Sequence, residues 1–299
     1  MKQLVKKIIV GLYNLKLIDD ITITKLKYRY KCHKKLNLKN PKNINEKINW
    51  MKFYGDTSRW GELADKFAVR NYIESCGYKN SLVMLYGYWE SPEDIEWDTL
   101  PNKFVMKMNN GCGDIIICED KNKINKEYIK SHFARLINQK YGIESGEPHY
   151  ASIKPYIIAE ELLDATKQNI PSSSLIDYKF YCTNGTPLCV FMACNRGSGK
   201  ASIALYDTEW NSLAEYLMPN DHYSPLNINV PCPKTFNEML EMAKVLSSGF
   251  PIVRVDLYEV DGKVYFGEMT FTPQGGYLYN FNDDFLNQLG DKINIYENK

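Results

Sequence analysis

The chain has 299 residues, enough for two domains or for one domain with two lobes. Hydrophobic residues make up 44% and charged residues 24%, as in ordinary globular proteins, and the formal net charge is only +1. The charge balance therefore gives no indication of a nucleic-acid partner. The eight cysteines form no CxxC pair and the four histidines show no HxH or HxxxH spacing, so we expect reduced thiols and no structural zinc site.

Residues 1–16 contain apolar side chains at helical spacing, namely Leu4, Ile8, Leu12 and Leu15. The apolar run is interrupted at Gly11 and is too short for a helix that spans a membrane, which needs about 20 apolar residues. We expect a helix packed on the body of a cytoplasmic protein. The alternative is a surface helix that makes peripheral contact with the inner face of the cell membrane.

The predicted elements follow in chain order. Residues 1 to about 75 are expected to be mainly helical, with helices within 40–55 and 60–77. Short strands are predicted in 81–89, 103–108 and 114–118, then a helix in 125–142 and a strand in 156–163. Strands in 178–183, 187–194 and 201–207, a helix in 235–249 and a hairpin in 254–271 complete the chain. This mixture predicts an α+β fold in two lobes that divide near residue 160.

The hairpin 254–271 alternates apolar and polar residues. A two-residue loop at Asp261-Gly262 would send Asp256 and Glu268 to opposite faces of the sheet. A three-residue loop with Gly262 left-handed, or an equivalent bulge, keeps both acids on one face and gathers the odd-numbered residues, including Tyr265, on the other. We expect the second arrangement because it buries the odd-numbered apolar residues together. Val264 and Phe266 are even-numbered and apolar, so they do not fit this division.

Two hypotheses explain a sheet face that carries Arg254, Asp256 and Glu268. Two neighbouring carboxylates suit Mg²⁺, which commonly takes one or two carboxylates together with substrate phosphates. Alternatively, the face is simply solvated and Arg254 pairs with Asp256. This stretch alone leaves both hypotheses open.

Three other stretches contain candidate ligand-binding residues. In 104–118, Lys107 ends a strand before the loop Asn109-Asn110-Gly111-Cys112-Gly113, which suits phosphate binding but also occurs in loops without ligands. In 194–202, "CNRGSGKAS" lacks the first Gly and the final Ser or Thr of a P-loop, so Arg196 and Lys200 are anion contacts or part of an ordinary basic loop. In 158–164, "IAEELLD" is an inter-lobe hinge or a plain strand end.

The order of these features resembles the ATP-grasp superfamily, and most closely its TupA-like branch, which is associated with bacterial surface-polysaccharide gene clusters. The similarity covers roughly residues 40–291 and includes "NPKNINEKINWMK", "LADKFAVRNYI", "LPNKFVMKMNNGCGD", "DYKFYC" and "RVDLYEVDGKVYFGEMTFTPQGG". It implies an ATP-grasp fold in which ATP and Mg²⁺ lie between two antiparallel sheets. The chain would then comprise a helical N-terminal region (1–75), a smaller lobe (76–160) and a larger lobe (161–299).

The resemblance also implies roles for individual residues. Arg254, Lys107 and Arg196 would be catalytic, and Asp256, Glu268 and Thr270 would bind Mg²⁺. ATP would contact Lys107, Asn110, Gly111, Cys112, Gly113, Glu160, Glu161, Leu162, Leu163, Asp164 and Lys179. Thr270 and Cys112 depart from the family pattern, in which Asn and Ser are common at these places. Lys66 matches a family lysine without an assigned role.

The function implied by the resemblance is an ATP-dependent carboxylate–amine ligase that acts through an acyl phosphate. The carboxylate would belong to a uronic acid or an amino acid, joined to an amine in a capsule or O-antigen pathway. A glycosyltransferase of the same pathway is the first alternative, although no two aspartates form a DxD pair. A nucleotide-binding module without catalytic activity is the second.

Overall fold

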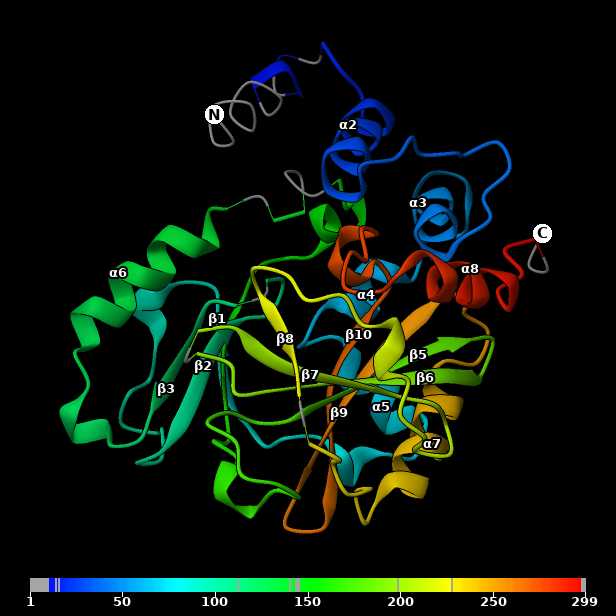
Figure 1. Cartoon of the computed structure of the whole chain (residues 1–299). Coiled ribbons are helices and arrows are strands. Elements are labelled where there is room, and N and C mark those ends of the chain that lie inside the picture. The colour runs from blue at the N-terminus through cyan, green and yellow to red at the C-terminus, as the bar shows by residue number, and fades with distance from the viewer. Residues whose placement is uncertain are drawn as a thin grey trace.

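The computed structural model describes residues 11–13, 15, 17–111, 113–139, 141–142, 146–197, 199–226 and 228–296. Two β-sheets lie side by side, with helices packed around them (Figure 1). This architecture confirms the predicted α+β class. The helices are α2 (Asp20–Cys32), α3 (Ile44–Tyr54), α4 (Trp60–Ala64), α5 (Val69–Ser75), α6 (Lys126–Ile137), α7 (Phe236–Leu246) and α8 (Asp283–Asp291).

The smaller sheet has four antiparallel strands in the order β1-β4-β2-β3. Its strands are β1 (Leu85–Trp89), β2 (Phe104–Met108), β3 (Ile115–Cys118) and β4 (Ile157–Glu160). Side chains alternate between its two faces, so Phe104 and Met106 of β2 pack in one apolar cluster with Ile129 and Phe133 of α6. Helix α6 thus covers one face of this sheet and leaves the other for Lys107.

The larger sheet has six strands in the order β10-β9-β5-β6-β7-β8. Its strands are β5 (Asp177–Thr183), β6 (Thr186–Cys194), β7 (Ala201–Tyr206), β8 (Tyr223–Pro225), β9 (Val253–Val260) and β10 (Lys263–Thr270). All neighbours are antiparallel except the short pair β7–β8, which is parallel.

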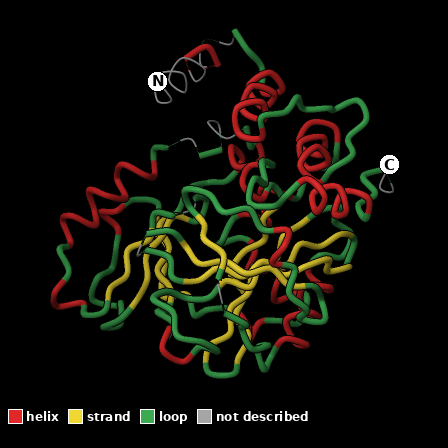
Figure 2. The backbone as a smooth tube through the Cα atoms, in the orientation of Figure 1, coloured by secondary structure: helices red, strands yellow, loops and turns green. Residues whose placement is uncertain are grey.

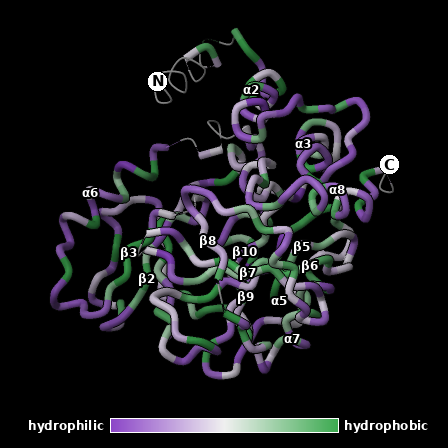
Figure 3. The backbone as a smooth tube through the Cα atoms, in the orientation of Figure 1, coloured by the Kyte–Doolittle hydropathy of each residue, from purple (hydrophilic) through white to green (hydrophobic). Residues whose placement is uncertain are grey.

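The main apolar core packs on both faces of the larger sheet, because Tyr181 and Phe191, which lie on the face of Lys179, also belong to it. It joins strand residues such as Val255 with Met239 and Met242 of α7. Helix α3 contributes Ile48 and α5 contributes Ile73 to the same cluster. Figure 2 shows these helices around the strands. In Figure 3, many of the hydrophobic residues lie in the strands. The helices α3 to α5 therefore pack against the larger sheet.

The hairpin β9–β10 reaches the expected pairing through a bulge, which is one of the two predicted arrangements. Its loop has two residues, Asp261 (φ 56) and Gly262 (φ 69), so the three-residue loop, the other arrangement, is wrong. A bulge at Gly267 shifts the register, and Glu268 then lies opposite Asp256, as predicted. A Cβ on Gly267 would lie 2.9 Å from the backbone oxygen of Asp256, so only glycine fits this bulge.

The bulge also reassigns the residues that precede it. Tyr265 pairs with Tyr258 and therefore lies on the face of Asp256, so its predicted place among the buried odd-numbered residues is wrong. Val264 and Phe266 belong to the main apolar core instead. The even-numbered apolar residues that did not fit the sequence pattern are thus explained by one extra residue in β10.

The single helix predicted in 60–77 is interrupted. Helix α4 ends at Ala64 and α5 begins at Val69. Between them, the Asp65 carboxylate accepts a hydrogen bond from the Phe67 amide at 2.8 Å, and the Lys66 amide donates to the Asn109 carbonyl at 3.1 Å. A side-chain turn and a contact with another segment replace the helical hydrogen bonds here. This break places Lys66 near the loop that follows β2 and begins at Asn109.

A tight turn at 272–276 follows strand β10. Three successive residues have left-handed backbone conformations: Gln274 (φ 51), Gly275 (φ 72) and Gly276 (φ 82). A non-glycine residue in this conformation needs support from its surroundings. The Thr272 hydroxyl contributes by donating a hydrogen bond to the buried Glu147 carboxylate.

Helix α3 holds this turn through three buried polar side chains, Asn45, Asn49 and Lys52, which share one face at helical spacing. They donate hydrogen bonds of 3.1, 2.7 and 2.5 Å to the carbonyls of Leu278, Gly276 and Gly275, respectively. The Lys52 ammonium also lies 5.0 Å from the centre of the Tyr277 ring. Burial lowers the pKa of Lys52 to about 7, against the opposing effect of Glu147.

Within the described ranges, no helix combines the length and the apolar composition that crossing a membrane requires. The helix predicted within residues 1–16, whether packed on the body or facing a membrane, falls almost entirely outside the described residues.

Candidate functional site

Asp256 and Glu268 form a cross-strand pair on the face of the larger sheet opposite Val255 and helix α7. Arg254 lies between them and donates to both oxygens of Asp256, at 2.6 and 2.8 Å, and to Glu268 Oε1 at 2.9 Å. The same guanidinium donates to the Thr270 hydroxyl at 3.1 Å. The prediction that the two acids share a face is confirmed. The face is not solvated, because the Asp256 side chain is fully buried.

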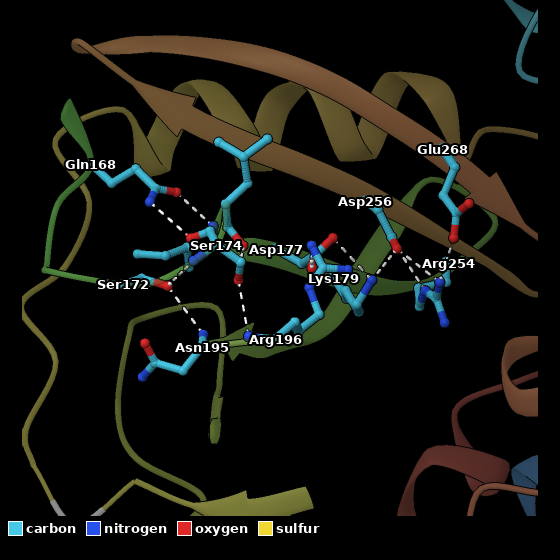
Figure 4. A network of polar contacts seen from close by, with 12 residues as sticks. Gln168, Ser172, Ser174, Asp177, Lys179, Asn195, Arg196, Arg254, Asp256 and Glu268 are labelled. Carbon is cyan, nitrogen blue, oxygen red and sulfur yellow. Dashed lines mark hydrogen bonds and ion pairs between the residues drawn. The ribbon is translucent and has the colours of Figure 1, made fainter. Parts of the chain in front are cut away.

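Strand β5 adds further charges to this face (Figure 4). Lys179 lies opposite Asp256 in the register, and its ammonium is 2.5 Å from Asp256 Oδ2 and 3.3 Å from Asp177 Oδ1. Arg196, from the loop between β6 and β7, is 2.6 Å from Asp177 Oδ2. The structure thus places Arg196 at the end of the same network as Lys179 and Asp256.

The network is a sequence of alternating charges, which we call the charge chain. It consists of Arg196, Asp177, Lys179, Asp256, Arg254, Glu268 and Lys66. Each neighbouring pair lies within 2.5 to 3.6 Å.

Burial and counter-charges act against each other on these pKa values. Burial alone would raise the pKa of Glu268, but Lys66, Arg254 and Lys179 outweigh it and hold the pKa well below its ordinary value. Burial raises the pKa of Asp256, although Arg254 and Lys179 favour its ionised form. The nearby acids overcome burial and raise the pKa values of Lys179 and Arg254. Both cations therefore stay charged at neutral pH.

Lys66 connects the loop after β2 to the larger sheet. Its ammonium donates to the Gly111 carbonyl of this loop at 2.6 Å and lies 3.6 Å from Glu268 Oε2 of β10. The sequence similarity included Lys66 but left its role open. A helix prediction through 60–77 hid its position, because the break at Asp65 is what turns it toward the loop.

Lys107 lies on the open face of the smaller sheet. Its ammonium is 2.5 Å from Glu160 Oε2, and Arg70 of α5 approaches Glu160 Oε1 at 3.4 Å. Arg70 is a member of this site that the sequence analysis missed. It falls within the similar stretch 63–73, but nothing in its spacing indicates a partner ninety residues away.

Apolar residues surround Lys107 on the same face. The register pairs Lys107 with Ile115 on β3 and pairs Val105 with Ile117. Ile115 and Ile117 are more than half exposed, at 52% and 59%. Exposed isoleucines beside a lysine form an apolar surface with one cationic group, which suits a flat aromatic ligand that carries phosphates.

The loop that follows β2 is anchored at its first residue. The buried Asn109 side chain donates to Asp65 at 2.8 Å and accepts from the Tyr156 amide at 2.7 Å. Asn110 is also buried, and Gly113 has a left-handed backbone (φ 89). Cys112 lies outside the described residues.

The predicted hinge residues diverge after strand β4. The Glu161 amide donates to the Met84 carbonyl at 2.9 Å, whereas Glu160 faces Lys107. Leu163 packs in a small apolar cluster with Val83 and Val260, and Leu162 is partly buried. Asp164 is exposed and caps the short helix that follows, where its carboxylate accepts from the Thr166 amide at 3.0 Å. The structure does not bring Asp164 to the charge chain.

A small cavity lies where the two sheets meet. It measures about 30 Å³ and is lined, among others, by Lys66, Lys107, Glu160, Tyr258 and Gly267. Its volume is far below the roughly 300–1,000 Å³ of a ligand pocket.

The donor set of Asp256, Glu268 and Thr270 fits Mg²⁺, which prefers carboxylate and other hard oxygen ligands. This donor set holds two carboxylates, and no cluster of three or more acidic, His or Cys residues that could hold a metal occurs among the described residues. The remaining coordination positions would be filled by water or ligand oxygens.

The family model described as TupA-like ATPgrasp matches residues 46–294. No curated protein matches the chain.

Several solved structures are similar in part. D-alanine–D-alanine ligase from Bacillus anthracis, complexed with ATP, shares 14% identity over 77% of this chain and 58% of its own, with a TM-score of 0.39. The ATP-grasp ligase PsnB, solved with a precursor variant, Mg and ADP, shares 13% over 82% and 63%, with a TM-score of 0.43. D-alanine–D-alanine ligase from Helicobacter pylori shares 15% over 86% and 68%, with a TM-score of 0.42. The chain spans less than two thirds of the first two proteins.

Proposed function

This chain belongs to the TupA-like ATP-grasp family, and from that premise we propose that it is an ATP-dependent carboxylate–amine ligase with ATP and Mg²⁺ as cofactors. One observation carries the proposal. Two carboxylates and a hydroxyl share a sheet face with Lys179 and Arg254, and Lys66 reaches this face from the side of the phosphate loop. Cations for phosphates and oxygen ligands for a divalent ion thus converge between two lobes.

We assign the nucleotide to the surfaces that face this junction. The adenine would pack on the smaller sheet near Ile115 and Ile117, with the hinge Glu160–Leu163 at its edge and Glu161 or Asp164 near the ribose. Lys107 and Lys179 would bind phosphates, and Asn110–Gly113 would close over them. Lys107 can be released for this task because Glu160 keeps Arg70 as a second partner. The lobes would be the segments 76–160 and 161–299, preceded by the helical region 1–75.

The metal would be held by Asp256, Glu268 and Thr270. When bound, Mg²⁺ neutralises charge on the phosphate oxygens and polarises the phosphoryl group that is transferred. Arg254 would contribute a second positive charge to the transferring phosphoryl group, and Arg196 a third near its edge. Closed lobes would exclude water from the reactive product.

The reaction has two balanced steps. A carboxylate oxygen attacks the γ-phosphorus, the bond to the bridging oxygen of ADP breaks, and an acyl phosphate and ADP result. The amine nitrogen then attacks the acyl carbon, the C–O bond to phosphate breaks, and the amine loses a proton. The sum is an amide (or peptide) bond, ADP and inorganic phosphate.

The proposed carboxylate is that of a uronic acid or an amino acid, within the assembly of a surface polysaccharide. The support is the family's association with such gene clusters, so this part rests on the family alone. The competing proposals are a glycosyltransferase and a nucleotide-binding module without catalysis.

The test is a screen of uronic acids and amino acids, each with a panel of amines, ATP and Mg²⁺, that measures ADP and phosphate release and the mass of the product. The proposal predicts ADP release that depends on both substrates, and an amide product. Asp256→Asn serves as the inactive control. Turnover of UDP-sugars without ATP would favour the glycosyltransferase instead, and ATP binding without any turnover would favour the binding module.

A further inference from the structure

The charge chain has more cations than carboxylates. Its four cationic and three anionic side chains give it a net charge of +1. This excess positive charge matters because most side chains of the charge chain are buried, where Coulomb interactions are less screened than in water.

Every oxygen of the two carboxylates among the proposed metal ligands already has a cationic partner. In Asp256, Oδ1 accepts from Arg254, and Oδ2 accepts from Arg254 and Lys179. In Glu268, Oε1 accepts from Arg254, and Oε2 lies 3.6 Å from the Lys66 ammonium. A divalent ion that arrives alone must displace these groups and leave buried cations without partners, which is strongly unfavourable.

A triphosphate removes that obstacle. It carries oxygens that can accept hydrogen bonds from Arg254, Lys66 and Lys179, so these cations exchange one anionic partner for another. Lys179 also has a second anionic partner, Asp177 at 3.3 Å, so it is not left without a counter-charge when Asp256 binds a metal.

We infer that Asp256 and Glu268 bind a divalent cation only after nucleotide phosphates have accepted the hydrogen bonds of Arg254. While no metal is bound, Arg254 is the counter-ion of the two carboxylates. The inference rests on the proposed function for the identity of the nucleotide. It adds an order of binding. Without nucleotide, the affinity of the two carboxylates for a metal is low because their oxygens contact Lys179, Arg254 and Lys66.

The test uses Mn²⁺ as a spectroscopic probe for Mg²⁺. Free Mn²⁺ is measured by electron paramagnetic resonance during titration of the full chain, with and without adenylyl imidodiphosphate at saturating concentration. For the wild type we expect Mn²⁺ to bind the protein–nucleotide complex at least about tenfold more tightly than it binds either the protein or the nucleotide alone. Equal Mn²⁺ affinity for the protein with and without nucleotide, or no effect of protein on Mn²⁺ binding by the nucleotide, overturns the inference.

The decisive variant is Arg254→Met, which keeps an unbranched apolar side chain in place of the arginine stem. It removes the cationic partner of Asp256 Oδ1 and of Glu268 Oε1, and it brings the net charge of the seven side chains of the charge chain to zero. We expect it to bind Mn²⁺ without nucleotide at least about tenfold more tightly than the wild type does. The exposed Arg135→Met in α6 is the matched control and leaves Mn²⁺ binding unchanged. If Arg254→Met binds Mn²⁺ no better than the wild type, Arg254 is not the counter-ion.

Arg254→Met removes a buried charge, so its fold is checked by circular dichroism. Lys66→Met, at the more accessible end of the charge chain, is the second variant. It frees Glu268 Oε2 and predicts a smaller gain in Mn²⁺ affinity without nucleotide; no gain in either folded variant contradicts the inference. These binding measurements need no turnover, so they can succeed even where the ligase screen fails.

Discussion

Two regions of this molecule bury lysine ammonium groups, with opposite consequences. In the charge chain, Lys179 lies between two carboxylates, and its pKa is raised despite burial. At the turn 272–276, Lys52 contacts a carbonyl and an aromatic ring, and its pKa falls to about 7. Glu147 contributes only at longer range there. The comparison teaches that burial alone does not decide the charge of a side chain; a counter-charge in direct contact does.

Asp256→Asn should have the largest effect on stability, because it removes the carboxylate that contacts both Arg254 and Lys179. Two buried cations would lose their common partner, and we expect the free energy of unfolding to fall by about 3–5 kcal/mol. Urea denaturation at pH 7 measures it. A loss below about 1 kcal/mol would mean that neighbouring acids or water compensate.

Lys52→Met probes the region without a contacting counter-charge. The folded pKa of about 7 lies below the ordinary value of 10.5, so folding releases a proton between these values. Stability of the wild type should therefore rise with pH above 7 by up to about 1.4 kcal/mol per pH unit. In Lys52→Met this rise should disappear from the same denaturation series. An unchanged pH profile would show that Lys52 keeps its proton through other partners.

Glu268→Gln tests whether the charge of a buried carboxylate stabilises the fold, through the pH dependence of the free energy of unfolding. Because the folded pKa of Glu268 is depressed, its ionised form stabilises the fold above the ordinary value of 4.5, and this contribution is lost as pH falls below it. The variant should lose about 1–3 kcal/mol at pH 6 and progressively less toward pH 3. A destabilisation that does not change with pH would indicate lost packing instead of lost charge.

The bulge at Gly267 fixes where Glu268 lies relative to Asp256. In Gly267→Ala, the new methyl group would meet the Asp256 carbonyl and the Tyr258 ring, each at 2.9 Å. We expect a loss of about 1–3 kcal/mol from crowding, together with weaker Mn²⁺ binding in the presence of nucleotide. Gly262→Ala, where a Cβ has open space, is the control: its left-handed backbone costs about 1 kcal/mol, and nucleotide-dependent Mn²⁺ binding stays intact. Intact Mn²⁺ binding in Gly267→Ala would show that the bulge is not needed for the site.

Much of the site could be predicted from the sequence because alternation along a strand is a local property. The spacing of Arg254 and Asp256 places both on one face of any straight strand. Family similarity added Lys107, Lys179 and the phosphate loop. The presence of Glu268 on the same face followed only from the demand that apolar residues be buried together.

The remainder could not be read from spacing. A period of two holds only until a strand gains a residue, so the bulge at Gly267 reversed the expected place of Tyr265. Helical periodicity likewise concealed the break at Asp65, because the hydrogen bond from Lys66 to Asn109 joins residues 43 positions apart.

The sequence by itself determined the fold class, the family and the residue types of the site, since these depend on composition, periodicity and motif order. Tertiary structure alone decided which charges touch: Arg196 reached Asp177, Lys66 reached Glu268, and α3 closed on the turn after β10. The reason is that the strength and the sign of an electrostatic effect depend on distance and burial, and both arise only when distant segments pack together.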